Sequence, residues 1–285
     1  MKKIEYTDSR IQQAIVLYKS GKAIKTICKS LALDDSVLRK FLIQENCLRK
    51  RSESIRLCKS KARIYDDALD WLLPDALYWI GFLYADGHIE KSPRQRISLT
   101  LSEMDKEHLV KYSKFFGTNI PIKDVTQENQ KPAPGQINFE GRYLRVSFSS
   151  EIIYNRLKQL GFTNNKTMFI TPHELLKNSR DFWRGVVDGD GSLYYPNDSR
   201  NNGKYNPLIL ECSGTQQTLL SLLDFFKNNN IVTEAIPHKD KRKNVWKLSI
   251  NDVSMKAIKL LYKDASVYLD RKYNKYKENE SFAIK

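Results

Sequence analysis

The chain has 285 residues, with 48 lysines and arginines against 33 aspartates and glutamates, for a formal charge of +15. Hydrophobic residues make up 41% and charged residues 28%, a mixture that excludes wholesale disorder. The length favours two domains. The excess positive charge predicts a polyanionic partner, either nucleic acid or an anionic membrane surface.

The sequence contains no sign of export or membrane insertion. No apolar run approaches the roughly 18 residues that span a bilayer, and the first residues lack the apolar core of a secretory signal. We therefore expect a soluble intracellular protein. No cysteine pair or histidine cluster has the spacing of a zinc site, so we expect free thiols in a reducing compartment. The four cysteines are Cys28, Cys47, Cys58 and Cys212.

The positive charge is concentrated near the N-terminus. Residues 1–63 hold 16 basic and 6 acidic side chains, a net charge of +10, whereas residues 64–285 hold 32 and 27, a net charge of +5. We expect a DNA-binding domain over residues 1–52, followed by a polar basic linker over residues 53–71.

Residues 1–52 predict three short helices. The first has apolar positions at helical spacing, begins at Asp8 or Ser9 and ends at Gly21. The second covers residues 23–31, and a turn at residues 32–34 leads to the third. Asp35 or Ser36 is the expected cap of this third helix.

Two short helices joined by a tight turn, the second of them basic, resemble the helix-turn-helix of resolvase-type DNA-binding domains. Ala32 stands where that family usually has a turn glycine. The resemblance makes Arg39 and Lys40 candidate DNA contacts. A plain three-helix bundle with a solvated basic face is the alternative.

The rest of the chain contains an internal repeat, with residues 72–160 similar to residues 178–261. Each copy opens with an apolar, helix-like stretch that ends in Asp-Gly. Gly81 precedes Asp86 by five residues, and Gly185 precedes Asp190 by the same interval. The two acids are 104 residues apart.

Later segments of the two copies also correspond. Residues 143–148 and 245–250 alternate between apolar and polar positions, which predicts strands with one buried and one wet face. Arg145 and Lys247 occupy equivalent positions on the wet faces. Helical patterns follow, so each copy is predicted to be α-β-β-α-β-β-α.

A glycine inside a helix is locally unfavourable and suggests close packing. Gly81 and Gly185 would let the two motif helices approach one another, which would bring Asp86 and Asp190 together at one end. Gly87 and Gly191 are expected to suit the helix exits. Two adjacent carboxylates resist ionisation unless a cation is present, and Mg²⁺ prefers oxygen ligands.

These two motifs resemble those of the LAGLIDADG homing endonucleases that carry both motifs on one chain, over roughly residues 72–277. The resemblance implies an α+β fold in which tandem αββαββα repeats, here residues 72–165 and 166–285, form a pseudo-twofold saddle over DNA. The small all-α helix-turn-helix domain precedes it. Tyr84 departs from the motif, whereas Asp188 keeps it; this position is not the family's metal ligand.

The same resemblance implies a monomer that hydrolyses phosphodiester bonds of double-stranded DNA at a long, specific site. Asp86 and Asp190 would bind two or three divalent cations, Mg²⁺ or Mn²⁺, together with the carbonyls of Ala85 and Gly189. No small-molecule cofactor and no membrane partner is expected. Such mobile-element proteins act in the cytoplasm or nucleoid of a prokaryotic or phage-infected cell, or in an organelle.

Basic residues on the strands complete the expected DNA face. The family places a basic residue near each active site, so Arg145 and Lys247 are candidates for catalytic support, with simple phosphate contact as the equal alternative. Residues 268–276 predict either a final helix that packs its tyrosines or a DNA contact. The further candidate DNA contacts are Arg94, Arg96, Ser98, Lys241 and Arg242.

Two other functions use the same scaffold. A transcription regulator would bind DNA without cutting, but such proteins usually lack the acids that both motifs here retain. An intron maturase would act on RNA, whereas the helix-turn-helix pattern favours duplex DNA. An intein is not expected, because the chain ends without a His-Asn splice junction.

Overall fold

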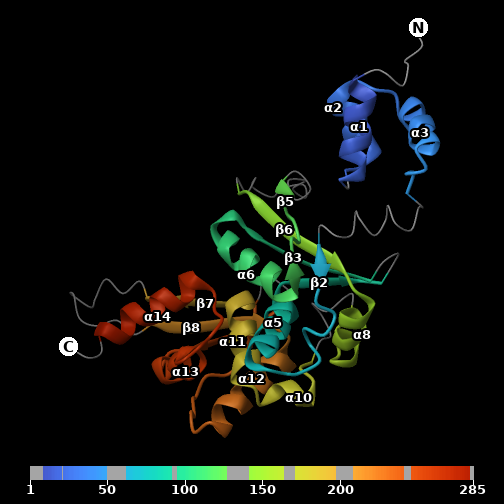
Figure 1. Cartoon of the computed structure of the whole chain (residues 1–285). Coiled ribbons are helices and arrows are strands. Elements are labelled where there is room, and N and C mark those ends of the chain that lie inside the picture. The colour runs from blue at the N-terminus through green and yellow to red at the C-terminus, as the bar shows by residue number, and fades with distance from the viewer. Residues whose placement is uncertain are drawn as a thin grey trace. The chain divides into compact units, whose positions relative to one another are not determined.

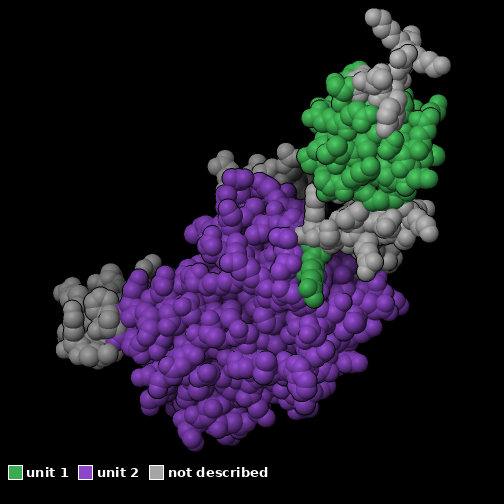
Figure 2. Space-filling model, viewed as in Figure 1, with its two compact units in different colours: residues 1–63 green, residues 64–285 purple. Residues whose placement is uncertain are grey.

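The computed structural model describes residues 9–20, 22–49, 62–91, 95–126, 141–163, 171–196, 208–240 and 245–282. The chain divides into two compact units, residues 1–63 and residues 64–285, which Figure 2 shows in green and purple. Residues 53–61, nearly half of the predicted linker, lie outside the described residues. The same holds for Cys58, Arg94, Lys241 and Arg242.

The first unit contains the three predicted helices, drawn in blue in Figure 1. They are α1 (Ser9–Lys19), α2 (Ile24–Leu31) and α3 (Asp35–Gln44). Each helix contributes apolar residues to one small core, because these residues recur at helical spacing along one face. The buried members are Ile11, Ala14, Ile15, Tyr18, Ile27, Leu33, Leu38 and Leu42.

The turn between α2 and α3 shows why resolvase-type domains usually have glycine where this chain has Ala32. Ala32 has φ 50° and ψ 46°, the left-handed conformation that glycine adopts without strain. The predicted cap of α3 was wrong by one residue: Asp34 is the N-cap and accepts a 2.8 Å hydrogen bond from the Ser36 amide. Asp34 has extended backbone, which lets its carboxylate reach that amide, whereas Asp35 is already helical.

The second unit contains both predicted repeats, and the order of their elements confirms the α-β-β-α-β-β-α pattern. The first repeat consists of α5 (Pro74–Ala85), β2 (Gly87–Glu90), β3 (Arg96–Ser102), α6 (Lys106–Phe116), β5 (Ile122–Asp124), β6 (Tyr143–Ser149) and α8 (Glu151–Gln159). The second consists of α11 (Arg180–Asp190), β7 (Gly191–Tyr194), β8 (Ile209–Gly214), α12 (Gln216–Asn228), β9 (His238–Lys239), β10 (Trp246–Ile250) and α13 (Ser254–Tyr262).

Five shorter or peripheral elements supplement the repeats. They are β1 (Arg63–Ile64), the 3₁₀ helix η1 (Glu103–Asp105), β4 (Gly117–Thr118), α10 (Glu174–Lys177) and α14 (Asp270–Phe282). The last of these confirms that residues of the basic and aromatic tail form a helix, and it buries Tyr276. No helix within the described part of the chain has the length and apolarity needed to cross a membrane.

Each repeat builds an antiparallel four-stranded sheet with the same strand order. The first sheet runs β2-β3-β6-β5 and the second β7-β8-β10-β9. In the first, Arg145 pairs with Thr100; in the second, Lys247 pairs with Ser213. Alternate residues of β6 are buried, as the period-two pattern predicts. The two halves of the unit are therefore related in topology as well as in sequence.

The motif helices α5 and α11 lie side by side between the two sheets (Figure 1). Eight residues of α5 are buried, because the helix is apolar around its whole circumference and neighbours enclose it. Pro74 occupies the first turn of α5, where its missing N–H costs no helical hydrogen bond. In α11, the Ser179 hydroxyl caps the helix by accepting from the Phe182 amide at 3.1 Å.

Candidate active site

The two motif helices approach each other backbone to backbone at their glycines. A Cβ added at Gly81 would lie 2.0 Å from the carbonyl oxygen of Phe182, and one added at Gly185 would lie 2.1 Å from that of Tyr78. No Cβ can occupy either position without displacing the opposite helix. The close packing that the sequence predicts at these glycines is therefore confirmed, and it is reciprocal.

The same packing brings the carboxyl ends of the motif helices together. A Cβ at Gly189 would lie 2.3 Å from the Ala85 Cβ and 3.4 Å from Asp86 Oδ2. Asp190 follows Gly189 directly and is the last residue of α11, while Asp86 caps α5. Both aspartates are exposed. One acid from each repeat therefore lies at the same end of the helix pair.

Gly87 and Gly191 lie at the helix exits, as predicted, but without the left-handed conformation of a glycine cap. Neither has the positive φ of a glycine helix cap, since Gly161 alone among the described glycines does. A Cβ at either position would instead lie 2.5 Å from the preceding helical turn, against Leu83 or the carbonyl oxygen of Val187. These glycines let the chain turn sharply from helix into strand without a steric clash.

The donor atoms at this end of the helix pair suit a hard cation. Carboxylate and carbonyl oxygens are the ligands that Mg²⁺ prefers, and Mg²⁺ usually keeps several waters. Across the described ranges, no group of three or more His, Cys, Asp or Glu side chains could form a metal cage made of protein alone. The exposed carboxylates of Asp86 and Asp190 are donors of the type that Mg²⁺ prefers.

Solved structures with a similar fold are LAGLIDADG homing endonucleases. A substituted form of I-SmaMI is 13% identical, with 75% of this chain and 91% of that chain covered and a TM-score of 0.49. I-SmaMI bound to an uncleaved DNA target with calcium ions is 14% identical, with 75% and 91% covered and a TM-score of 0.46. I-GzeII in complex with its DNA target is 15% identical, with 74% and 88% covered and a TM-score of 0.39. No protein-family model and no curated protein matches the chain.

The predicted basic pair lies on equivalent strands, and each side chain is held by neighbours. Arg145 on β6 donates from Nε to Thr100 Oγ1 at 2.9 Å, across the strand pair. Lys247 on β10 has its Nζ 3.5 Å from Glu211 Oε1 and 3.7 Å from Asp240 Oδ2. Both side chains are half-buried.

The other predicted DNA contacts differ in accessibility. Arg39, Lys40 and Arg96 are exposed. Ser98 is not on a wet face as expected: it is only 7% exposed, because it is a short side chain in a central strand, paired with His88 and Ser147. Alternation along a strand predicts which face of the sheet a side chain lies on. Whether water reaches that side chain also depends on the size of the side chains around it.

A buried polar network that sequence reasoning missed links the two motif helices. Asp188 on α11 is 1% exposed and accepts hydrogen bonds from Tyr78 Oη at 2.7 Å, Tyr262 Oη at 2.5 Å and the Leu269 amide at 2.8 Å. Burial raises the pKa of Asp188, and the nearby Lys272 ammonium and the hydroxyl donors oppose that rise. The motif supplied a signal for Asp188, but its partners come from distant parts of the sequence.

Tyr84 occupies the corresponding place in the first motif and makes different contacts. Its hydroxyl lies 2.7 Å from Thr218 Oγ1, and its ring packs edge-on against Phe182 at 5.5 Å between centroids. Tyr84 is buried. The departure of this residue from the motif is thus accommodated by packing between the repeats.

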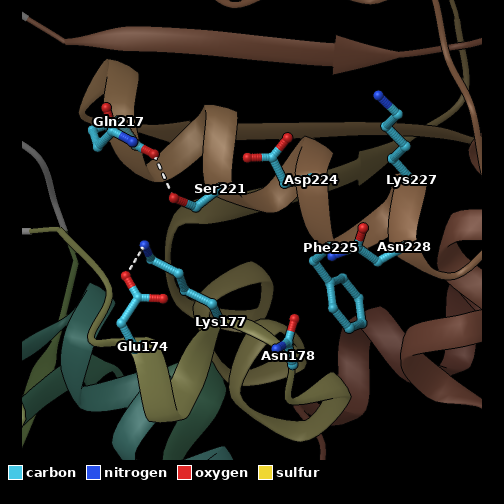
Figure 3. Close-up of a pocket in the computed structure, with 9 residues that line it drawn as sticks. All are labelled: Glu174, Lys177, Asn178, Gln217, Ser221, Asp224, Phe225, Lys227 and Asn228. Atoms are coloured by element: carbon cyan, nitrogen blue, oxygen red, sulfur yellow. Dashed lines mark hydrogen bonds and ion pairs between the residues drawn. The ribbon is translucent and has the colours of Figure 1, made fainter.

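A polar groove of about 450 Å³ lies away from these residues, between α10 and α12. Figure 3 shows that Glu174 and Lys177 pair on one side of it, while the Ser221 hydroxyl bonds the Gln217 carbonyl on the other. None of the sequence-predicted site residues lines it. The groove is therefore separate from the candidate active site.

Proposed function

We propose that this chain is a site-specific endonuclease that hydrolyses phosphodiester bonds of double-stranded DNA at a long target site. The observation that carries the proposal is the pairing of Asp86 and Asp190, one from each repeat, at the same end of the glycine-packed helix pair. The strands of a DNA duplex are related by twofold symmetry, which two-fold related protein surfaces match. A pseudo-twofold pair of acids suits such a substrate.

The catalytic residues in this proposal are the two acids. Asp86 and Asp190 would hold divalent cations, Mg²⁺ or Mn²⁺, with the backbone carbonyls of Ala85 and Gly189 as further ligands. Bound metal ions supply an activated water and stabilise the leaving oxygen of a phosphodiester. The exposure of both carboxylates leaves room for a phosphate to reach them.

Basic residues would stabilise the negative charge of the scissile phosphates. A guanidinium is a poor proton donor and acceptor, so the contribution of Arg145 is electrostatic. Lys247, held near Glu211 and Asp240, would either order a water or contact a phosphate. In the first unit, Arg39 and Lys40 on the exposed face of α3 would contact DNA and extend the footprint.

The decisive experiment incubates the full-length protein with DNA from its own genomic neighbourhood in Mg²⁺, Ca²⁺ or EDTA. We expect cleavage in Mg²⁺, and binding without cleavage in Ca²⁺. Asp86→Asn and Asp190→Asn should each abolish cleavage and preserve binding. Asp224→Asn is the matched control, because this exposed aspartate on α12 lies in the separate polar groove.

Three results would overturn the proposal. Full cleavage by either active-site variant would remove the acids from the mechanism. Tight DNA binding without cleavage in any divalent metal would instead indicate a regulator built on this scaffold, and preferential binding of structured intron RNA would indicate a maturase.

A further inference from the structure

Lys272, on the last helix of the chain, is buried against the end of the second motif helix. Its side chain is 1% exposed, although lysine is among the residues least often buried. Its Nζ donates to three backbone carbonyls, those of Val187 at 2.6 Å, Asp188 at 2.7 Å and Gly191 at 2.6 Å. These three residues flank Gly189 and Asp190 in the sequence.

The arrangement provides hydrogen-bond partners for both the Lys272 ammonium and the backbone carbonyls. The last carbonyls of a helix lack intrahelical partners and carry partial negative charge, which a cation stabilises. An ammonium has three N–H donors, and three carbonyls receive them here. Burial lowers the pKa of Lys272 to about 8, with the carboxylates of Asp188 and Asp86 opposing the fall, so the side chain remains charged at neutral pH.

The segment that leads into α14 fixes Lys272 from both repeats. The Leu269 amide donates to Asp188 at 2.8 Å. Asp270 pairs with Lys111 at 2.6 Å, and Arg271 pairs with Asp105 at 3.1 Å, so two consecutive residues are anchored to the first repeat. The backbone that carries Lys272 is therefore fixed by contacts with both repeats.

We propose that Lys272 is a positioning residue for the candidate active site: its ammonium fixes the terminal turn of α11 and so sets the orientation of the Gly189 carbonyl and the Asp190 carboxylate. The inference rests on the proposed function where it concerns metal binding. It extends that function, because the hydrogen bonds of Lys272 go to backbone carbonyls at the end of α11 and at Gly191.

The test compares Lys272→Met with Lys275→Met in the full-length protein. Lys275 is the matched control, because it lies on the same helix, is exposed and donates to a single carbonyl, that of Leu193, at 2.9 Å. Lys272→Gln, which keeps an amide donor without the charge, serves if the methionine variant does not fold. Thermal unfolding of each variant verifies folding.

The first readout is amide hydrogen exchange of metal-free protein. We expect exchange across residues 187–193 to increase about tenfold in Lys272→Met and to stay within twofold of the parent in Lys275→Met, because the end of α11 and Gly191 lose the three hydrogen bonds from the ammonium. Unchanged exchange in the Lys272 variants would overturn the proposal, and so would an equal increase in the control.

The second readout is the Ca²⁺ concentration that half-maximally supports DNA binding, measured beside the Mg²⁺ midpoint for cleavage. Both should rise about tenfold in the Lys272 variants, with DNA affinity in EDTA unchanged. Midpoints within twofold of the parent would overturn the positioning role. A parent protein that never cleaves DNA would contradict the proposed nuclease, while the exchange experiment would still decide whether Lys272 orders α11.

Discussion

The Tyr78 hydroxyl on α5 donates to the Asp188 carboxylate on α11 across 2.7 Å, so a buried hydrogen bond joins the motif helices of the two repeats. Hydrogen bonds to charged groups contribute about 1.5–3 kcal/mol, against about 0.5–1.5 kcal/mol for neutral pairs. We expect Tyr78→Phe to cost about 2 kcal/mol of unfolding free energy and Tyr84→Phe, which loses a hydroxyl–hydroxyl contact, to cost less. Urea unfolding followed by tryptophan fluorescence measures both.

That readout is specific for the second unit, because all 4 tryptophans lie beyond residue 63. Equal losses in the two phenylalanine variants would argue that Asp188 is protonated. A hydrogen bond from Tyr78 to a neutral carboxyl would then contribute no more to stability than the hydroxyl–hydroxyl hydrogen bond of Tyr84.

The close contacts at Gly81 and Gly185 predict that adding a single methyl group at either position strongly destabilises the second unit. Gly81→Ala and Gly185→Ala should each destabilise the second unit by about 3 kcal/mol or more, because the new Cβ would overlap a backbone carbonyl of the opposite helix. Gly214→Ala is the control, since the nearest atom to its added Cβ is 3.8 Å away. Similar urea midpoints for all three variants would contradict the packing.

His108 predicts a pH dependence of stability. Burial, reinforced by the charge of Lys111, lowers the pKa of His108 to about 3. Between the ordinary pKa of histidine, about 6.5, and this value, the unfolded chain binds a proton that the folded chain does not, so this contribution to stability is lost as the pH falls. The full contribution is present above the higher pKa.

His108 Nε2 lies 3.0 Å from the Tyr78 hydroxyl. The matched variant is His108→Gln, whose amide can donate to that hydroxyl but does not titrate. From pH 7 to pH 4, the parent should lose about 3 kcal/mol more unfolding free energy than this variant. Urea unfolding at both pH values measures the difference. Parallel losses in the two proteins would show that His108 is protonated in the folded state.

Ala32 predicts a stabilising substitution in the first unit. Its left-handed conformation costs about 1 kcal/mol for alanine and nothing for glycine, so Ala32→Gly should slow amide exchange in α2 and α3 about fivefold. Ala14→Gly, in the middle of α1, should have the opposite effect. Faster exchange in Ala32→Gly would mean that the extra freedom of the unfolded chain outweighs the relief of strain.

The first unit also predicts the salt dependence of DNA binding. Residues 1–63 hold 16 basic side chains, and each phosphate that a lysine or arginine neutralises adds nearly one to the slope of log affinity against log salt concentration. Removal of residues 1–63 should weaken binding and flatten that slope. Binding isotherms at several salt concentrations give the answer, and an unchanged slope would exclude DNA contact by this unit.

Much of the fold was predictable because its determinants are local. Alternation along residues 143–148 predicted β6, and Gly81 and Gly185 predicted the close helix pair with Asp86 and Asp190 at its end. What could not be predicted depends on tertiary contacts. The side chain of Lys272 lies in a tail that reads as basic and aromatic, and only the folded chain brings it to α11. Ser98 has the right alternation, yet it is buried in a central strand of the sheet.

The contacts of Tyr84 and Asp188 make the halves of the second unit non-interchangeable. Asp188 faces a hydroxyl donor on Tyr78, while Tyr84 packs on Phe182, which stands in the place of Tyr78 in the other repeat. Two copies of the second repeat would set each Asp188 against a phenylalanine that cannot donate, and would bury a carboxylate with one donor missing on each side. The second half thus discriminates against a copy of itself, and pairing of unlike halves is favoured, as in a heterodimer.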